Sequence, residues 1–119
     1  KAATRDPNRI KRLWRKNPKA NVGIATGGPS GFFALDVDRK NDGFAAFAKL
    51  EKEHGKLPFT KKCKTGDGGF HLYFKMPAGA TIPNSAGKVA KGIDIRGEGG
   101  YVIAPPSNHH SGGGYEWVN

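Results

Sequence analysis

Two carboxylates alternate with apolar residues in the segment Leu35-Asp36-Val37-Asp38-Arg39. Successive side chains of a β-strand point to opposite faces, so we expect Asp36 and Asp38 on one face, about 6.6 Å apart along the backbone. The preceding residues, 31–35, form a short apolar run that is typical of a buried strand. Hard cations such as Mg²⁺ are held by one or two carboxylates together with water and substrate phosphates. The pair therefore predicts a divalent-metal site, although Asp-x-Asp also occurs in solvated turns.

A third acid, Asp94, stands between two isoleucines in the segment 92–97. A charge in the middle of a short apolar strand needs a partner. Arg96 lies two residues further on and could be that partner, since both side chains point to the same face. Alternatively, the sheet brings Asp94 beside Asp36 and Asp38, where it would act as a third metal ligand. The residues alone leave both alternatives open.

A glycine-rich turn at residues 65–69 precedes a strand that carries His71. The alternation predicts His71, Tyr73 and Lys75 on one face and the apolar residues of the strand on the other, core face. His71 would then lie on the non-core face beside backbone N–H groups freed by glycines, an arrangement able to bind phosphate oxygens. The alternative is an ordinary surface histidine after a turn.

Two further segments carry chemically active side chains with weaker signals. A strand over 101–104 is stopped by two prolines, and Ser107 directly after them could be only a turn residue. The pair His109-His110 does not predict a metal site, because adjacent side chains of an extended segment point to opposite sides and the surroundings are rich in glycine.

Helix and strand signals alternate along the chain. Asp6 before Pro7 predicts a helix start, and apolar residues at helical spacing continue it to about Asn17. A second amphipathic helix is expected over 43–54, ending near Gly55. We expect strands over residues 22–25, 32–37, 60–65, 70–75, 93–96, 101–104 and 115–118. The turn at 27–31 predicts that the first two strands form a hairpin leading into the acidic pair. The fold class predicted is α+β, with a mixed, largely antiparallel sheet flanked by helices.

The composition indicates one basic domain over residues 1–119. There are 20 Lys and Arg against 10 Asp and Glu, a formal net charge of +10, which favours a nucleic-acid or nucleotide partner. One face of the first predicted helix carries five cations that are either a solvated face or a phosphate-binding stripe: Arg9, Lys11, Arg12, Arg15 and Lys16. The single cysteine, Cys63, excludes an internal disulfide. Nothing in the sequence resembles a signal peptide or a membrane span, so we expect a reducing cytoplasm, that of the host if the gene belongs to a phage or plasmid.

Five segments taken together resemble the bifunctional primase-polymerase (prim-pol) domain of the archaeo-eukaryotic primase superfamily, which is common in phage and plasmid replication proteins. These segments are 21–24, 35–38, 68–74, 92–97 and 100–107. Each is weak alone, but as an ordered set they are specific, and the resemblance runs from about Thr4 to Trp117. It implies a primase-like catalytic core with an element resembling the RNA-recognition motif.

The resemblance also implies roles for individual residues. Two metal-binding acids of the family match Asp36 and Asp38, and a third matches Asp94. A histidine that contacts the triphosphate of the incoming nucleotide matches His71. The family often has a small hydroxyl residue near the position of Gly69, and this departure removes one expected phosphate contact. Family members usually begin further upstream, so we expect a trimmed or minimal catalytic core.

The activity that the resemblance implies is template-directed nucleotidyl transfer with two divalent cations, Mg²⁺ or Mn²⁺, held by the three acids. Its expected substrates are a single-stranded DNA template, a primer and dNTPs or NTPs, and we expect a monomer that works with a helicase domain or partner. Arg96 and Lys64 are expected to neutralise the triphosphate, with Gly69 and Ser107 as weaker nucleotide contacts. The basic first helix, or Lys61 and Lys62, would follow the template phosphates.

Two other functions use the same features. A metal-dependent nuclease or phosphohydrolase would employ the same three acids with water as the nucleophile. A non-catalytic module for single-stranded nucleic acid would suit the charge, but such modules present stacking aromatic side chains on the open face. Here that face of the histidine strand carries one aromatic residue, Tyr73, so stacking is the weaker interpretation.

Overall fold

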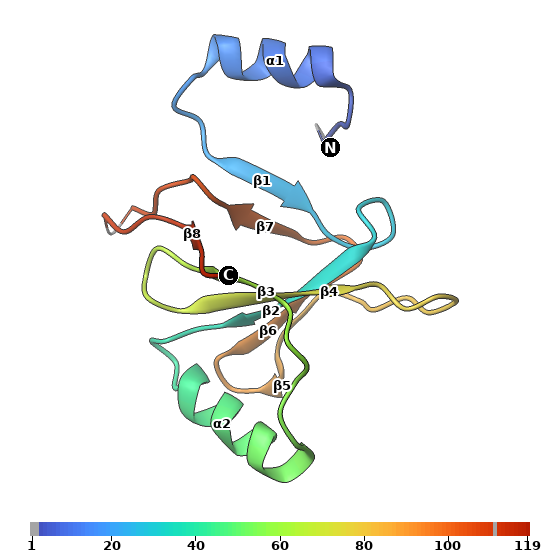
Figure 1. Ribbon diagram of the computed structural model, residues 1–119, viewed down its shortest axis with the longest axis vertical. Coiled ribbons are helices and arrows are strands. Elements are labelled where there is room, and N and C mark those ends of the chain that lie inside the picture. The colour runs from blue at the N-terminus through green and yellow to red at the C-terminus, as the bar shows by residue number, and fades with distance from the viewer. Residues whose placement is uncertain (1–2, 111) are drawn as a thin grey trace.

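Two helices and two antiparallel sheets make up the protein, an α+β fold as the sequence predicts (Figure 1). The computed structural model describes residues 3–110 and 112–119. In chain order the elements are α1 (Pro7–Lys16), β1 (Val22–Ala25), β2 (Phe32–Val37), α2 (Gly43–His54), β3 (Lys61–Lys64), β4 (Phe70–Lys75), β5 (Ser85–Ala90), β6 (Ile93–Arg96), β7 (Tyr101–Ala104) and β8 (Glu116–Trp117). The larger sheet has the order β5-β6-β2-β4-β3-β8, and β1 pairs with β7 in the smaller one.

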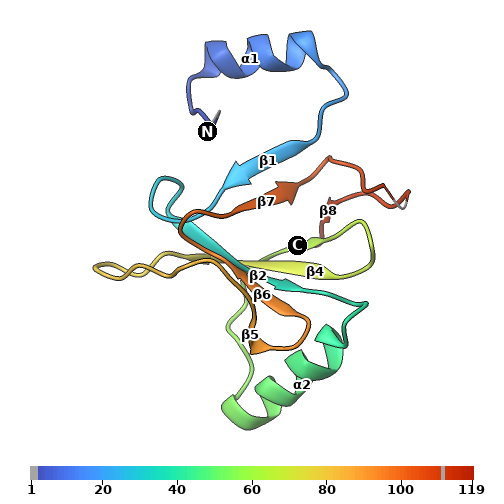
Figure 2. The same cartoon turned by 180° about the vertical axis from the view of Figure 1, so that it is seen from behind.

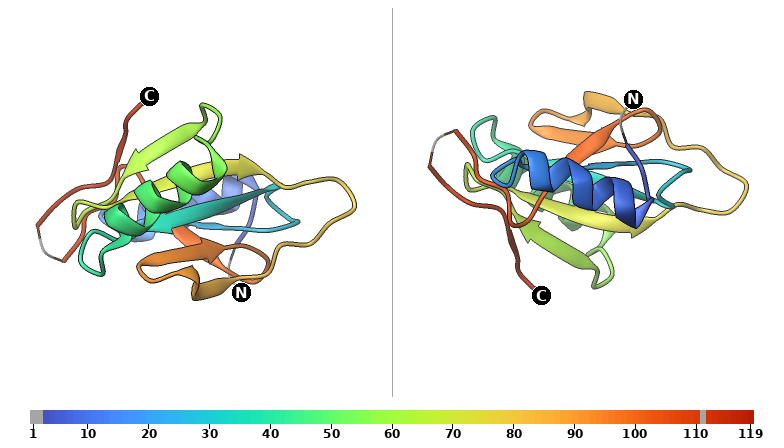
Figure 3. Two further views of the ribbon diagram at one scale, coloured as in Figure 1. Left: turned by 90° about the horizontal axis from the view of Figure 1, so that it is seen from below. Right: turned by 90° about the horizontal axis from the view of Figure 1, so that it is seen from above.

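The elements are stacked in layers along the longest axis of the molecule. Helix α2 covers one face of the six-stranded sheet, the β1–β7 pair lies over its other face, and α1 lies beyond that pair (Figures 1 and 2). In the view from below α2 lies in front of the strands, and in the view from above α1 does (Figure 3). Phe44 and Phe47 of α2 pack against Phe70 of β4, with ring centroids 5.6 and 5.4 Å apart. The core face of β4 is thus the one predicted.

Helix α1 confirms the predicted start and end. The Asp6 side chain accepts a hydrogen bond from the backbone N–H of Asn8 at 3.1 Å, and Pro7 occupies the first helical position. The helix ends before Pro18, and none of its residues is buried. Its basic face is therefore in solvent. No helix in residues 3–110 and 112–119 is long and apolar enough to cross a membrane.

The predicted hairpin of the first two strands is wrong. Strand β1 pairs with β7, whereas β2 lies in the other sheet with β4 on one side and β6 on the other. Both edges of β2 are thus occupied, so β1 has no edge to join. The turn between them, with Gly27 at φ +101° and Gly31 at φ +76°, passes the chain from one sheet to the other, and only a bridge between Gly27 and Phe32 remains of the hairpin.

One strand was not predicted. Residues 85–90 form β5, an edge strand of small and polar residues with a bulge between Ala86 and Ala90. Its sequence lacks the alternating apolar pattern because one side of an edge strand has no partner and this one is mostly exposed. The β5–β6 pairing nevertheless matters for the site, because it places the backbone of Gly87 against Asp94.

The face of β4 that carries His71 is covered rather than open. The alternation is as predicted, but the β1–β7 pair lies over this side of the sheet (Figure 2). His71 is 5% exposed, and its cross-strand neighbour Cys63 is fully buried. Burial raises the pKa of the Cys63 thiol to about 11, an effect that a backbone hydrogen bond from Glu116 only partly offsets. This second covering layer was not predicted, because it forms only when β1 pairs with β7, and these two strands are far apart in the chain.

Candidate active site

A row of polar residues crosses the middle of the larger sheet. Asp94 of β6 is directly opposite Asp36 of β2, and Asp36 is directly opposite His71 of β4. Directly opposed side chains of antiparallel strands lie on the same face with Cβ atoms about 5 Å apart. The sheet therefore brings together three residues that are far apart in the sequence, as the site prediction requires.

These residues line a cavity of about 220 Å³. Its walls come from the carboxyl end of β2, the turn before β4, strand β6 and the segment between β7 and β8. The lining residues are Asp36, Asp38, Thr65, Asp67, His71, Asp94, Arg96, His109 and Tyr115. All three predicted acids therefore face one cavity, together with two of the predicted nucleotide-binding residues.

Arg96 joins the two opposed acids. Its Nη2 donates to Asp36 Oδ2 at 3.1 Å and to Asp94 Oδ2 at 3.3 Å. Like charges placed directly opposite each other destabilise a sheet, and the guanidinium offsets this repulsion. Arg96 itself is opposite Ala34, whose small, fully buried side chain leaves room for the guanidinium to lie across the strand. Asp94 thus pairs with Arg96, as the first alternative predicts, and it also lies beside Asp36. Its role as a metal ligand stays a prediction.

His71 contacts the other oxygen of Asp36. Its Nε2 lies 3.4 Å from Asp36 Oδ1, and the imidazole side chain is only 7% exposed. Nδ1 is buried and has no hydrogen-bond partner in the described part of the chain. One nitrogen therefore faces an acid and the other is enclosed. In this arrangement His71 orients Asp36, and a phosphate contact would need the ring to turn.

The surroundings keep Asp36 ionised. Burial alone would raise the pKa of Asp36, but hydrogen bonding and charge attraction from His71, and then from Arg96, outweigh it and hold the pKa below its usual value. At neutral pH this carboxylate is therefore charged. A charged carboxylate inside a cavity is the form that binds a cation.

Asp38 is fixed by the turn after β2. Its Oδ1 accepts the N–H of Lys40 at 2.9 Å, and its Oδ2 accepts from Asn41 Nδ2 at 2.6 Å. With Asp94 it also lines a second cavity, of about 360 Å³, at the β5–β6 turn. Asp38 therefore lines both cavities.

The donor set fits a divalent cation of the hard type. Asp36, Asp38 and Asp94 offer only carboxylate oxygens, which Mg²⁺ and Mn²⁺ accept. Each of their six oxygens already receives one hydrogen bond or ion pair, and an ionised carboxylate oxygen has a further lone pair. Within the described residues, however, no three His, Cys, Asp or Glu side chains are close enough to hold one ion as they stand. The guanidinium of Arg96 lies between two of the three acids.

The glycine-rich turn contributes shape rather than free donors. A Cβ at Gly69 would lie 2.4 Å from the carbonyl oxygen of Val37, so the turn can approach the end of β2 only with glycine there. The N–H of Gly69 donates to Asp67 Oδ1 at 3.3 Å and that of Gly68 to the carbonyl of Thr65 at 3.1 Å. The expectation that these N–H groups are free for phosphate is thus wrong for both.

Two predicted lysines lie on the opposite face of the sheet. Lys62 Nζ is 4.4 Å from the ring centroid of Phe70, which packs under α2. Lys64, two residues on in the same strand, shares that face. Lys64 does not line the acidic cavity, so its predicted triphosphate contact is not supported by the geometry. Lys61 points the other way, with Nζ 4.7 Å from the Trp117 ring.

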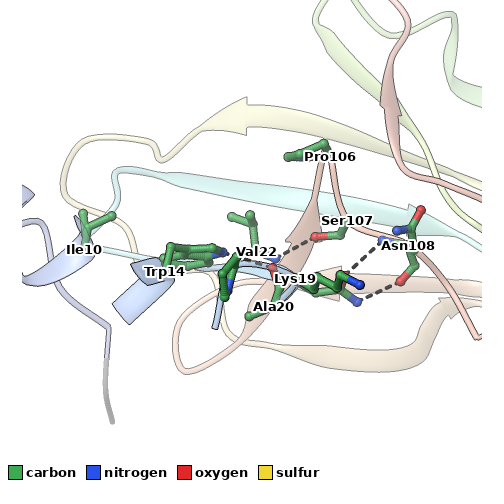
Figure 4. Close-up of a pocket in the computed structure, with 10 residues that line it drawn as sticks. Ile10, Trp14, Lys19, Ala20, Val22, Pro106, Ser107 and Asn108 are labelled. Carbon is green, nitrogen blue, oxygen red and sulfur yellow. Dashed lines mark hydrogen bonds between the residues drawn. The ribbon is translucent and has the colours of Figure 1, made fainter. Parts of the chain in front are cut away.

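Ser107 has a structural contact away from the acids. It lies in a cavity of about 710 Å³ between α1 and the end of β7, shown in Figure 4. The side chain is 4% exposed, and Oγ accepts the N–H of Val22 at 2.6 Å. Trp14 Nε1 donates to the carbonyl of Ala20 at 3.0 Å in the same cavity. Ser107 therefore ties β1 to the end of β7, and its predicted nucleotide contact is not supported by its position.

Four lining residues were not predicted: Thr65, Asp67, His109 and Tyr115. Asp67 Oδ1 accepts from Thr65 Oγ1 at 2.9 Å. Burial would raise the pKa of Asp67, but hydrogen bonds from Thr65 and Gly69 and the charge of His109 hold it below its usual value. Burial, followed by the neighbouring acids, raises the pKa of Tyr115. The glycine-rich turn was a signal for Asp67, whereas His109 and Tyr115 reach the cavity only through the path of the chain after β7.

Comparison with known proteins identifies the family of the chain. A search among curated proteins gives no match. The sequence model of the Prim-Pol family, described as "Bifunctional DNA primase/polymerase, N-terminal", matches residues 1–119. This match confirms the resemblance found in the sequence motifs. The chain therefore belongs to the Prim-Pol family of bifunctional DNA primase/polymerase N-terminal domains.

Proposed function

We propose that this domain is a primase-polymerase that joins nucleoside triphosphates to a 3′-hydroxyl on a single-stranded DNA template. The observation that carries the proposal is the meeting of Asp36, Asp38 and Asp94 at one cavity in a chain of this family. Three acids gathered on a chain of net charge +10 indicate a site for cations that in turn attract phosphates. We propose residues 1–119 as one catalytic domain.

The three acids are proposed to hold two divalent cations, Mg²⁺ or Mn²⁺. When bound, such ions activate the attacking hydroxyl and stabilise the charge of the departing pyrophosphate in an in-line displacement. The protein supplies charged carboxylates at fixed positions. Asp36 is oriented by His71 and Asp94 by the N–H of Gly87, which donates to its Oδ1 at 2.9 Å. Asp38 is oriented by the turn at Lys40.

Arg96 is proposed to bind the triphosphate. It is the arginine among the residues that line the cavity, and its planar guanidinium can donate two parallel hydrogen bonds to a phosphate. Its side chain is 32% exposed, so it can reach a ligand in the cavity. His71 and Tyr115 both line the cavity, and the burial of His71 limits access of water on its side.

The template is proposed to bind along the basic face of α1. This face lines a hollow of about 350 Å³ formed by Arg9, Arg12, Leu13, Arg15 and Lys16. Guanidinium and ammonium groups along an exposed helix contact successive phosphates without reading sequence. Lys61 and Lys62 lie on two different faces of β3, so at most one of them shares a side with the acids. We expect the domain to act as a monomer beside a helicase domain or partner.

Incorporation of labelled nucleotides on primed and unprimed single-stranded DNA tests the proposal, with Mg²⁺ and Mn²⁺ in separate reactions. We expect the wild type to extend the primer and Asp36→Asn to fall to background. Asp42→Asn, which removes a carboxylate outside the cavity, should extend like the wild type. The proposal fails if the wild type neither extends nor initiates with either metal. Shortening of the template under those conditions would assign the three acids to a nuclease.

A further inference from the structure

Arg96 holds a position that a cation bound by the acids would need. Its Nη2 lies 3.1 Å from Asp36 Oδ2 and 3.3 Å from Asp94 Oδ2. Those two oxygens are the ones that the opposed acids turn toward each other, since Oδ1 of Asp36 faces His71 and Oδ1 of Asp94 faces the N–H of Gly87. The guanidinium is thus the present counter-ion of the pair.

A divalent cation and a guanidinium cannot both occupy this place. They repel each other, and an ion held between Asp36 and Asp94 would compete with the guanidinium for the Oδ2 atoms that it now contacts. An ion bound by Asp36 and Asp94 therefore removes both carboxylate partners of Arg96. The arginine must then pair with another anion or remain half-buried without one, which is costly.

The space around Arg96 allows such a change. Its side chain is 32% exposed, so it is not locked in the core, and it lies at the wall of a cavity of about 220 Å³. The neighbouring hollow of about 360 Å³ shares Asp38 and Asp94 with that cavity and carries Lys91 at its edge. A phosphate chain placed in the 220 Å³ cavity would lie against the arginine, which lines that cavity.

We propose that Arg96 is an exchangeable counter-ion, paired with Asp36 and Asp94 in the free protein and with nucleotide phosphates once divalent cations bind. This rests on the proposed function for the identity of the phosphate ligand. Arg96 would thus have two successive partners, first the two acids and then the nucleotide phosphates, and it would affect metal binding and nucleotide binding in opposite directions. Arg96 opposes metal binding in the free protein and favours nucleotide binding in the loaded one.

The first test measures binding of Mn²⁺ alone, without nucleotide, by the loss of the free-ion electron paramagnetic resonance signal. Arg96→Gln removes the competing charge, so we expect it to bind Mn²⁺ roughly tenfold more tightly than the wild type. Arg39→Gln is the matched control, because Arg39 Nε donates to the carbonyl of Asp67 rather than to an acid of the pair. Equal or weaker Mn²⁺ binding by Arg96→Gln overturns the proposal.

A second measurement uses the wild-type protein, so it does not depend on the folding of a variant. The Nε–Hε resonance of Arg96 is followed by NMR during titration with diamagnetic Mg²⁺ and then with a non-hydrolysable dNTP. We expect one shift as Mg²⁺ displaces the guanidinium and another as phosphate replaces the acids. A resonance that stays unchanged while the metal binds overturns the proposal.

Nucleotide kinetics complete the test and separate it from the proposed function. Arg96→Gln should raise the KM for dNTP by about ten- to a hundredfold, since charge-assisted bidentate contacts to phosphate are lost. Arg96→Lys should raise the KM less than Arg96→Gln does, because lysine keeps the positive charge but lacks the paired N–H donors of the guanidinium. If the wild type extends primers but Arg96→Gln binds Mn²⁺ like the wild type, the exchange is wrong and the polymerase proposal stands. If the wild type does not extend but the Mn²⁺ result holds, the polymerase proposal is wrong, and the displacement of Arg96 by the metal stands without it.

Discussion

Asp36 and Asp94 are directly opposed on β2 and β6, and a single guanidinium nitrogen of Arg96 contacts both. Opposed carboxylates in one sheet repel each other, so the sequence would be unfavourable here unless cations were present. The fold supplies one cation from its own chain. In the catalytic proposal, divalent cations from solution take the place of this arginine. Asp36 and Asp94 would therefore bind Arg96 in the free protein and metal ions in the loaded one.

The stability of the protein should fall in acid partly through Asp36. Its pKa is lowered in the folded state, so the folded protein favours the ionised form. This contribution is complete above the unfolded pKa of about 4 and is lost as the pH falls through the folded value. Urea unfolding between pH 6 and pH 2.5 should show a shallower decline in the free energy of unfolding for Asp36→Asn than for the wild type. Asp42→Asn, at the start of α2, should decline like the wild type, and parallel curves for Asp36→Asn and the wild type would contradict the account.

Replacement of Gly69 should disturb the turn that borders the cavity. The Cβ of Gly69→Ala would meet the Val37 carbonyl oxygen at 2.4 Å, so the backbone must move. Overpacking of this kind costs about 1–3 kcal/mol. Gly23→Ala is the matched control, because its Cβ would meet nothing closer than 3.8 Å. Chemical denaturation should show the loss for Gly69→Ala alone; similar stability of the two variants would contradict the close approach.

Much of the fold could be predicted because its signals are local. The cap at Asp6, the alternation in β4 and the apolar run of β2 each depend on neighbouring residues. The partner of β1 could not be predicted, because it depends on which strands already occupy both edges of β2. Strand β5 escaped prediction because its pairing with β6, not its own composition, holds it in the sheet.

The acids of the candidate site were predicted for a similar reason, since Asp36 and Asp94 each interrupt an apolar strand. The strand register that places Asp36 opposite Asp94 could not be predicted, because it depends on how β2 and β6 pair and not on the sequence of either strand alone. Lys64 was assigned to the nucleotide because the sequence does not say which face of β3 joins the acids. Tyr115 was missed because its approach to His71, with ring centroids 6.4 Å apart, depends on the return of the chain after β7.

Ser107 should matter for stability and not for nucleotide binding. Ser107→Ala leaves the N–H of Val22 without its acceptor, which costs about 1–3 kcal/mol for a buried group. Ser30→Ala, in the exposed turn before β2, should change little. Denaturation and steady-state kinetics on the same variants check both statements. A raised KM for dNTP with unchanged stability would return Ser107 to the nucleotide site.

Template binding should depend on α1 and weaken with salt. Arg12→Gln combined with Arg15→Gln removes two charges from the exposed face, so the slope of log K against log salt for single-stranded DNA should fall by roughly 1.4. Lys49→Gln with Lys52→Gln removes two charges from α2 at the other end of the molecule and should leave the slope unchanged (Figure 1). Fluorescence anisotropy from 50 to 300 mM salt measures both. Equal slopes for the two double variants would contradict the assignment of α1.

The most direct test of the catalytic proposal is the position of Mn²⁺ in crystals grown with a non-hydrolysable dNTP. Anomalous scattering locates the ion without reference to activity. The account predicts Mn²⁺ bonded to carboxylate oxygens of Asp36 and Asp94, with the triphosphate in the same cavity and the Arg96 guanidinium turned to its phosphates. Mn²⁺ and triphosphate bound elsewhere on the protein, with Arg96 still joining Asp36 to Asp94, would contradict it.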